Sequence, residues 1–371
     1  MEPRRESVRG YTGVSARLVP ISGCGAKGPA CFLVNTSGAR IMLDLGHGPQ
    51  PGLRPDVSRI GRIDALLLSH THADHAGALE LRAQLGDPPV YASAIAAKLL
   101  EHAAVQGVLP LSGSTDICGI RVTTGRNGHA PGGVWMHLEV DGGLLYTGDY
   151  SVESDVYAYD PPPPARTVIL DGSYGDYDAP VHDCGAAIDK LVDSGAVLLP
   201  VPPPGRAADI ALHLFRRGVL PHVDAAVRSM LAKLGDEYRE CVRPGVAEEL
   251  AGIARDAPAI EGPTGAMLAA AADASRGAAA ELVLAWEYTP EPTIAFTGYV
   301  PPTTPADRLT RAKRATVVRW NVHPRISDNA ALVRSTGAKI VLPAFADAKH
   351  HFAWKAAFAP ATLAYEGPVV L

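Results

Sequence analysis

The segment His-Thr-His-Ala-Asp-His, residues 70–75, places four potential metal ligands within six positions of the chain. The four are His70, His72, Asp74 and His75. Neutral imidazoles and carboxylates suit zinc, and a catalytic zinc site keeps one coordination position open for water. Core packing does not explain ligand-type residues at this density, so the segment predicts a metal centre that activates water.

The residues on either side of this segment indicate how it is positioned. The apolar run from Ile63 to Leu68 leads directly into it, and small residues, Ala73 and 76–78, follow. This pattern predicts a buried strand that delivers the ligands at its carboxyl end, followed by the start of a helix.

Two more ligand-type residues follow predicted strands further along. His129 lies between strands expected at 120–123 and 134–140, and Asp149 comes directly after one at 144–147. Taken alone, each is typical of a surface loop or turn. Because ligands from separate strands can converge at the carboxyl ends of a sheet, we expect both to join the segment 70–75.

Composition limits the classes of protein that this chain can represent. Its 371 residues are 47% hydrophobic and 20% charged, as in a globular protein with a sizeable core, and no apolar stretch is long enough to cross a bilayer. The charged N-terminus has no apolar segment behind it, so a secretion signal is not expected. Five scattered cysteines indicate reduced thiols and a cytoplasmic location: Cys24, Cys31, Cys118, Cys184 and Cys241.

The net charge of −5 argues mildly against a nucleic-acid partner, but one segment is strongly basic. It contains Arg308, Arg311, Lys313, Arg314 and Arg319, opposed only by Asp307. From charge alone, a solvated face and a functional patch are about equally good explanations.

The order of predicted elements indicates an α/β fold interrupted by a second domain. Further strands are expected at 14–21, 31–35, 41–45, 66–69, 90–92, 167–170, 197–200, 293–296, 316–320 and 339–342. Helices are expected at 94–105, 184–193, from Ala207 onward, and over the Ala-rich stretch 267–284. The composition changes after about Pro180, where the second domain is expected to begin.

With these residues in place, the first half resembles a metallo-β-lactamase-fold hydrolase. Asp44, in Leu-Asp-Leu-Gly, matches the aspartate that orients the ligands in that family. The resemblance implies that His70, His72 and His129 hold a first zinc ion. It implies that Asp74 and His75 hold a second and that Asp149 bridges the two.

The second half resembles the β-CASP branch of that fold, whose members are nucleases. Residues 170–176, with Asp171, are similar to its motif A, and Val322-His323-Pro324 is similar to motif B. Residues 199–209 and 296–308 resemble the start and end of the branch's inserted cap. The implied architecture is an αββα sandwich formed by residues 1–180 and 316–371, with a β-CASP-type α/β cap at 181–315.

The chain departs from this branch at motif C. RNA-processing members have a histidine ligand after the next strand, where this chain has Phe345, which cannot bind zinc. The second metal is therefore expected to be weak or absent, although His350 or His351 could replace the missing ligand. Members that act on DNA also lack that histidine, which favours DNA as the substrate.

The resemblance implies a zinc-dependent phosphodiesterase. Zinc makes hydroxide available at neutral pH, His323 acts as general acid for the leaving 3′-oxygen, and Asp171 orients His323. Asp74 is counted with the catalytic residues, and Arg206, Arg308 and Arg311 are candidate phosphate contacts.

Three alternatives to a DNA nuclease remain open. The first is an RNA-processing ribonuclease, the second a non-catalytic scaffold, and the third a small-molecule metallo-hydrolase. The complete ligand set disfavours the scaffold, and the inserted domain disfavours the small-molecule enzyme. No membrane partner is expected, and the sequence identifies no protein partner.

Overall fold

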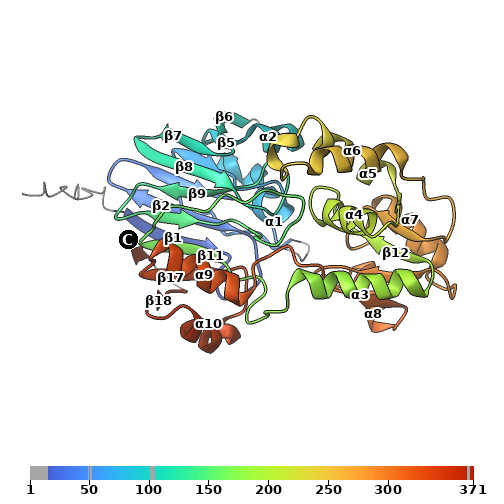
Figure 1. Ribbon diagram of the computed structural model, residues 1–371. Helices are drawn as coiled ribbons and strands as arrows, with labels where there is room; N and C mark the ends of the chain where they lie inside the picture. Colours follow the sequence, from blue (N-terminus) through green and yellow to red (C-terminus); the bar gives the residue numbers. More distant parts are fainter. Residues whose placement is uncertain (1–15, 49, 51, 101–104, 366–367) are drawn as a thin grey trace, which may run out of the picture.

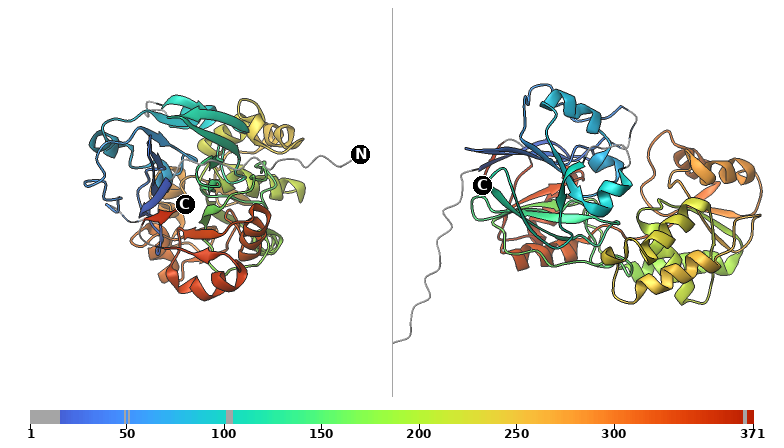
Figure 2. Two further views of the ribbon diagram at one scale, coloured as in Figure 1. Left: turned by 90° about the vertical axis from the view of Figure 1, so that its left-hand side faces the viewer. Right: turned by 90° about the horizontal axis from the view of Figure 1, so that it is seen from above.

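The computed structural model describes residues 16–48, 50, 52–100, 105–365 and 368–371. Within them, the strands form two seven-stranded sheets and one five-stranded sheet. The two larger sheets lie face to face, and the five-stranded sheet with its helices forms a lobe beside them (Figures 1 and 2).

The first large sheet has the order β19-β1-β2-β3-β4-β5-β6. Its strands are β1 (Ala16–Ser22), β2 (Cys31–Thr36), β3 (Arg40–Leu43), β4 (Ala65–Leu67), β5 (Val90–Ser93), β6 (Val105–Leu109) and β19 (Val369–Val370). Strands β3, β4 and β5 are parallel, so their carboxyl ends meet at one edge of the sheet. Asp44 and the segment 70–75 both follow strands at that edge.

The second large sheet has the order β18-β17-β11-β10-β9-β8-β7. Its strands are β7 (Gly113–Ile117), β8 (Ile120–Arg126), β9 (Val134–Leu138), β10 (Leu144–Tyr146), β11 (Thr167–Asp171), β17 (Ile340–Ala344) and β18 (Thr362–Leu363). Strands β10, β11 and β17 are parallel. Their carboxyl ends therefore bring Asp149, Asp171 and Phe345 to a common edge.

Apolar side chains fill the space between the two large sheets, among them Phe32 and Leu67 from one and Met136 and Ile169 from the other. Helices cover the outer faces. Those on the first sheet are α1 (Ala73–Ala76), η1 (Leu79–Leu85) and α2 (Ala94–Leu99), and those on the second are α9 (Ile326–Thr336), η3 (Ala348–His350) and α10 (His351–Ala357). This is the αββα sandwich that the sequence predicts.

The five-stranded sheet is parallel, with the order β13-β14-β12-β15-β16. Its strands are β12 (Val197–Pro200), β13 (His222–Val223), β14 (Ala266–Ala269), β15 (Thr293–Phe296) and β16 (Ala315–Val317). Alternate residues of β12 face opposite cores. Leu199 packs with α3 (Val181–Ser194), α4 (Arg206–Arg216), α5 (Ala225–Gly235) and α6 (Val246–Asp256), near η2 (Arg239–Cys241), while Leu198 packs with α7 (Gly277–Trp286) and α8 (Pro305–Arg311).

The fold class is confirmed, including an inserted α/β lobe. The domain limits at 180 and 315 stay a prediction; β16 extends across the second of them.

Two local predictions were wrong. The Ala-rich stretch 267–284 is not one helix, because its first residues belong to β14, which is buried between β12 and β13, and a loop precedes α7. Alanine's helix propensity is a weak preference that strand pairing in the sheet centre overrides. The helix expected at 94–105 ends at Leu99, and Val105 begins β6.

Residues 1–15, on which the expected absence of a secretion signal depends, lie outside the described part of the chain, as do residues 101–104. Among the described residues, no helix has the length and apolar character needed to span a bilayer. The five cysteines are all free thiols, as the sequence predicts.

Candidate metal centre

A tight backbone arrangement holds the ligand segment at the edge of the first sheet. His72 precedes α1, a single helical turn that carries Asp74 and His75. The loop after β3 packs directly against this turn: a Cβ at Gly46 would lie 1.7 Å from the carbonyl oxygen of Asp74, so only glycine fits. The loop begins at Asp44, whose φ of 57° is uncommon for a residue other than glycine.

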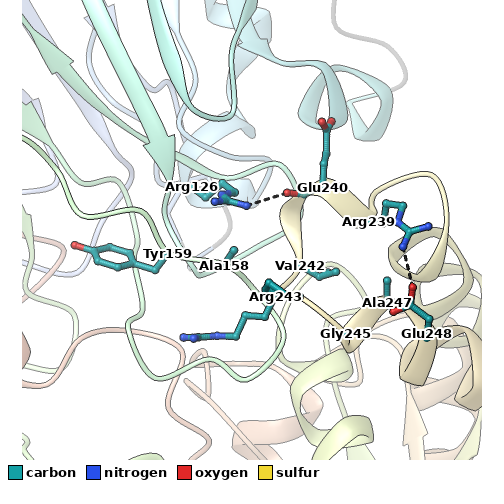
Figure 3. Close-up of a pocket in the computed structure, with 11 residues that line it drawn as sticks. Arg126, Ala158, Tyr159, Arg239, Glu240, Val242, Arg243, Gly245, Ala247 and Glu248 are labelled. Atoms are coloured by element: carbon teal, nitrogen blue, oxygen red, sulfur yellow. Dashed lines mark hydrogen bonds and ion pairs between the residues drawn. The ribbon is translucent and has the colours of Figure 1, made fainter.

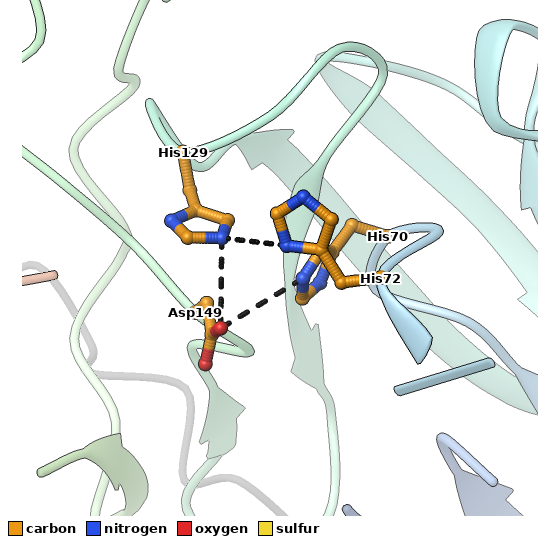
Figure 4. Close-up of side chains that lie close together, drawn as sticks. All are labelled: His70, His72, His129 and Asp149. Atoms are coloured by element: carbon orange, nitrogen blue, oxygen red, sulfur yellow. Dashed lines mark hydrogen bonds and ion pairs between the residues drawn. The ribbon is translucent and has the colours of Figure 1, made fainter. Parts of the chain in front are cut away.

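Four side chains from three loops converge to form the first cluster (Figure 4). They are His70, His72, His129 and Asp149, and their ligand atoms all lie within 4.8 Å of one another. The Nδ1 atom of His72 lies 3.0 Å from Nε2 of His129. The Oδ2 atom of Asp149 lies 3.5 Å from Nε2 of His129 and 3.8 Å from Nε2 of His70.

In His129 and His72, the ring nitrogen that points away from the cluster forms a hydrogen bond. That bond determines that the other nitrogen, which faces the cluster, carries a lone pair. His129 donates from Nδ1 to the carbonyl oxygen of Val322 at 2.6 Å, and His72 donates from Nε2 to that of Pro204 at 2.6 Å. A neutral imidazole carries one proton, so Nε2 of His129 and Nδ1 of His72 are both acceptors. Two acceptors 3.0 Å apart repel each other unless a cation lies between them.

His70 supports the same conclusion. Its Nε2 atom is buried and has no hydrogen-bond partner among the described residues. Burial, together with the neighbouring histidines, holds the pKa of His70 well below its usual value, and burial does the same for His129. Both rings are therefore neutral, the form in which imidazole binds metals. The donor set of three imidazole nitrogens and one carboxylate fits zinc.

A second cluster adjoins the first and contains Asp74, His75 and Asp149. His75 donates from Nδ1 to Oδ2 of Asp44 at 2.7 Å, which turns Nε2 toward Oδ1 of Asp149, 3.2 Å away. Asp44 does not reach the cluster; it holds His75 in the orientation that a ligand needs. The family resemblance implies that Asp44 orients the ligands, and this role stays a prediction.

Several groups that support the clusters were not found from the sequence. Asp44 also accepts hydrogen bonds from the backbone N–H of Ser69 at 2.6 Å and from the Tyr146 hydroxyl at 2.5 Å. Tyr146 lies in an apolar strand, where its type suggests only core packing. Pro204 and Val322 act through their backbone carbonyl groups, so their residue types in the sequence do not indicate this role.

Phe345 directly follows β17 and lies against the second cluster. Its ring is buried, with its centroid 5.0 Å from that of His75. The two histidines considered as replacements are engaged elsewhere: His350 lies 3.1 Å from Asp176, and His351 lies 2.9 Å from the Tyr365 hydroxyl. Among the described residues, neither belongs to the ligand groups of the cluster.

We expect Phe345→His to raise the amount of metal that the second cluster retains. The imidazole would occupy the space beside His75, and the φ of 63° at this position is one that histidine adopts more readily than most residues. Metal content after dialysis should rise from about one toward two equivalents per chain. Phe345→Leu, which adds no ligand, is the control; equal metal content in both variants would contradict the prediction.

His323 and Asp171 form a pair beside the first cluster. The Nδ1 atom of His323 lies 2.9 Å from Oδ2 of Asp171 and 3.7 Å from Oδ2 of Asp149. Burial disfavours the charged ring, but the two carboxylates outweigh it and raise the pKa of His323 above its usual value. Asp171 is itself fixed by the backbone N–H of Ser173 at 3.0 Å. The arrangement suits a proton donor.

The three candidate phosphate-binding arginines have different surroundings. Arg206 begins α4, next to Gly205, whose Cβ position is 3.5 Å from Nε2 of His72. It donates from Nε to the Thr297 hydroxyl at 2.8 Å, and its guanidinium covers Gly298, where a Cβ would lie 2.5 Å from Nη2. Burial lowers the pKa of Arg206 to about 10.

Arg308 and Arg311 are not brought to the clusters. Arg308 pairs with Glu287 at 2.5 Å and Arg311 with Asp307 at 2.7 Å. Both lie on α8, which packs on the face of the five-stranded sheet opposite to α4. Both side chains are exposed and each has an acidic partner, so their role as phosphate contacts stays a prediction.

A separate pocket lies between the sandwich and the lobe, near η2 and the start of α6 (Figure 3). Its arginines already have partners: Arg126 binds Asp160, Arg239 binds Glu248, and Arg243 donates to the carbonyl oxygen of Ser154. It contains none of the residues of the two clusters.

Comparisons with known proteins show what the chain is similar to. Residues 24–200 match the metallo-beta-lactamase superfamily. The chain is 27% identical over 273 residues to transcription termination factor FttA from Methanosarcina mazei, covering 58% of this chain and 42% of the relative. It is 27% identical over 244 residues to ribonuclease TTHA0252 from Thermus thermophilus, covering 54% and 55% respectively.

It is also 26% identical over 251 residues to endoribonuclease YSH1 from Kluyveromyces lactis, covering 53% of this chain and 32% of the relative. The matches thus span about half or less of the relatives' lengths. A solved structure of a protein of unknown function from Enterococcus faecalis superposes with a TM-score of 0.61 at 13% identity, over 96% of this chain and 100% of that one, which shows the fold alone. The predicted resemblance to the metallo-β-lactamase fold and its β-CASP branch is confirmed.

Proposed function

We propose that this chain, whose residues 24–200 match the metallo-β-lactamase superfamily, is a metal-dependent nuclease that hydrolyses phosphodiester bonds in RNA. The observation that carries the proposal is the convergence of the imidazoles of His70, His72 and His129 on the carboxylate of Asp149. Such a site activates water, and the His323–Asp171 pair beside it supplies the acid that a phosphodiester leaving group requires.

RNA replaces DNA as the favoured substrate. The preference for DNA depended on Phe345 alone, one position in motif C. The relatives that the chain matches are named as a ribonuclease, an endoribonuclease and a transcription termination factor. These names support the alternative that the sequence left open, an RNA-processing enzyme, better than they support a nuclease that acts on DNA.

The proposed roles of the residues follow from their contacts. His70, His72, His129 and Asp149 would hold a zinc ion, and His75 and Asp74 with Asp149 would hold a second ion weakly beside Phe345. Zinc bound there supplies hydroxide at neutral pH as the nucleophile. Asp171 keeps His323 protonated and oriented, and His323 donates its proton to the leaving 3′-oxygen.

Unpaired cations around the clusters support an anionic substrate. Among the described residues, neither Arg206 nor Lys27 forms an ion pair with a carboxylate; Lys27 instead lies over the Tyr299 ring, 5.1 Å from its centroid. Lys27 belongs to the sandwich and is close enough to His323 to lower its pKa slightly against the carboxylates. A partly buried cation without a partner is unfavourable, and a substrate phosphate would supply the missing charge.

The test is cleavage of end-labelled single-stranded RNA and DNA of matched sequence by the purified protein. We expect zinc-dependent cleavage of RNA and no cleavage by His72→Ala, which removes one donor of the first cluster. His182→Ala, which replaces an exposed histidine of α3, should cleave like wild type. Cleavage of DNA but not RNA would contradict the substrate, and full activity of His72→Ala would contradict the metal site.

A further inference from the structure

Arg319, the last cation of the basic segment, has different contacts from the other arginines of that segment. Arg308 and Arg311 bind carboxylates, and Arg314 donates to the carbonyl oxygen of Glu287. Arg319 is exposed and lies over two aromatic rings, 4.6 Å from the centroid of Tyr174 and 4.2 Å from that of Tyr177. Within the described residues, it has no carboxylate partner and its guanidinium donates no hydrogen bond.

The two rings fix the position of the guanidinium without occupying its donors. They meet edge to face, with centroids 5.6 Å apart and planes at 80°. An arginine that is oriented by aromatic faces keeps its N–H groups directed outward. A protein oxygen beside the guanidinium would accept hydrogen bonds from these N–H groups, as the carbonyl oxygen of Glu287 does for Arg314.

Tyr174 contacts both Arg319 and His323, the proposed general acid. Its hydroxyl donates to the carbonyl oxygen of Trp320 at 3.2 Å and accepts from the N–H of Val322 at 2.9 Å. Its ring also contacts His323, with centroids 5.1 Å apart. Arg319 therefore stands on the His323 side of the metal clusters, where the leaving group departs in the proposed reaction.

We propose that Arg319 binds the backbone phosphate adjacent to the scissile one on the leaving-group side. The inference rests on the proposed nuclease function and adds a substrate contact to it. The planar guanidinium presents parallel donors to phosphate oxygens, and Tyr174 and Tyr177 pre-orient it for that contact. Arg319 is a binding residue that touches a phosphate where no bond is made or broken.

The experiment combines a side-chain change with a matching change in the substrate. Arg319→Ala and wild type are assayed on an oligoribonucleotide whose cleavage position has been mapped. A second oligonucleotide carries one uncharged methylphosphonate at the linkage adjacent to the scissile bond, on its 5′ side. Arg255→Ala, an exposed arginine of α6 that pairs with Asp256, is the control.

On the natural RNA, Arg319→Ala should lower kcat/KM about tenfold, mainly through KM, because it removes a charged hydrogen-bonded contact. The methylphosphonate should cause a similar loss in wild type but little further loss in Arg319→Ala, because each change removes the same contact. The dependence of log kcat/KM on log salt should become shallower by about 0.7, the value for one phosphate on a single strand. Arg319→Lys should fall between the two proteins.

Three results separate failure of this inference from failure of the nuclease proposal. If wild type cuts RNA and the losses from Arg319→Ala and the methylphosphonate simply add, Arg319 does not bind that phosphate. The same holds if the salt dependence is unchanged. If wild type cuts no RNA, the proposed function is wrong and this inference fails with it.

Discussion

Asp149→Ala is expected to abolish RNA cleavage and to reduce the metal content of the protein. The carboxylate is shared by both clusters: Oδ1 lies 3.2 Å from Nε2 of His75, and Oδ2 lies 3.5 Å from Nε2 of His129. Without it, the three imidazoles of the first cluster lose the anion that balances a divalent cation. Loss of several kcal/mol of charge stabilisation corresponds to a fall in kcat of about a thousandfold or more.

The matched control is Asp176→Ala, which removes a carboxylate that is 63% exposed and pairs with His350. Elemental analysis and circular dichroism should show less metal but an unchanged fold for Asp149→Ala, and neither change for the control. Asp149→Asn, which keeps one oxygen but not the charge, should be intermediate in metal content. Activity of Asp149→Ala above a tenth of wild type would remove Asp149 from the proposed site.

His323→Ala is expected to slow RNA cleavage by about a hundredfold to ten thousandfold, the usual contribution of a general acid. The reason is its bond to Asp171 at 2.9 Å, which favours the protonated ring. The effect should depend on the leaving group. With bis(p-nitrophenyl) phosphate, whose leaving group needs no proton, the loss should shrink to about tenfold or less.

Metal content distinguishes this role from that of a ligand, because His323 also lies 3.7 Å from Asp149. His323→Ala should retain the metal of wild type, whereas His72→Ala should not. Equal losses on RNA and on the nitrophenyl ester would show that His323 is not the proton donor. Loss of metal from His323→Ala would show that His323 is a metal ligand instead.

The fold could be predicted because short apolar runs alternate with ligand-type residues at strand ends. Strand β15 has the predicted limits, and β12 does too, because each is a buried run closed by turn residues. The prediction of one helix over residues 267–284 was wrong because alanine is compatible both with a helix and with a strand in the crowded centre of a sheet. Its environment in the sheet, which the sequence does not reveal, decided between them.

The clustering of ligand-type residues was predictable for a similar reason, since the carboxyl ends of parallel strands must meet. Their individual metal roles remain predictions. The supporting groups were not predictable: the Pro204 and Val322 carbonyls act through backbone atoms, and Tyr146 looks like a core residue. Charge alone could not separate Arg319 from Arg308 and Arg311, because the difference is in their partners.

The carbonyl groups of Pro204 and Val322 connect the first cluster to parts of the chain outside the ligand loops. His72 is oriented by Pro204, which precedes α4 in the inserted lobe, and His129 by Val322, on the segment that returns to the sandwich. The geometry of the first cluster therefore depends on the lobe being in place. The ligand motif alone does not contain this information.

Metal dependence is tested most directly by removing metal with a chelator and then titrating zinc back while RNA cleavage is followed. We expect the metal-free protein to keep its fold, to cut no RNA, and to regain activity in proportion to the first equivalent of zinc bound. Undiminished cleavage by the metal-free protein would contradict the metal-dependent mechanism. Full reloading with zinc but no cleavage of RNA would contradict the nuclease function itself.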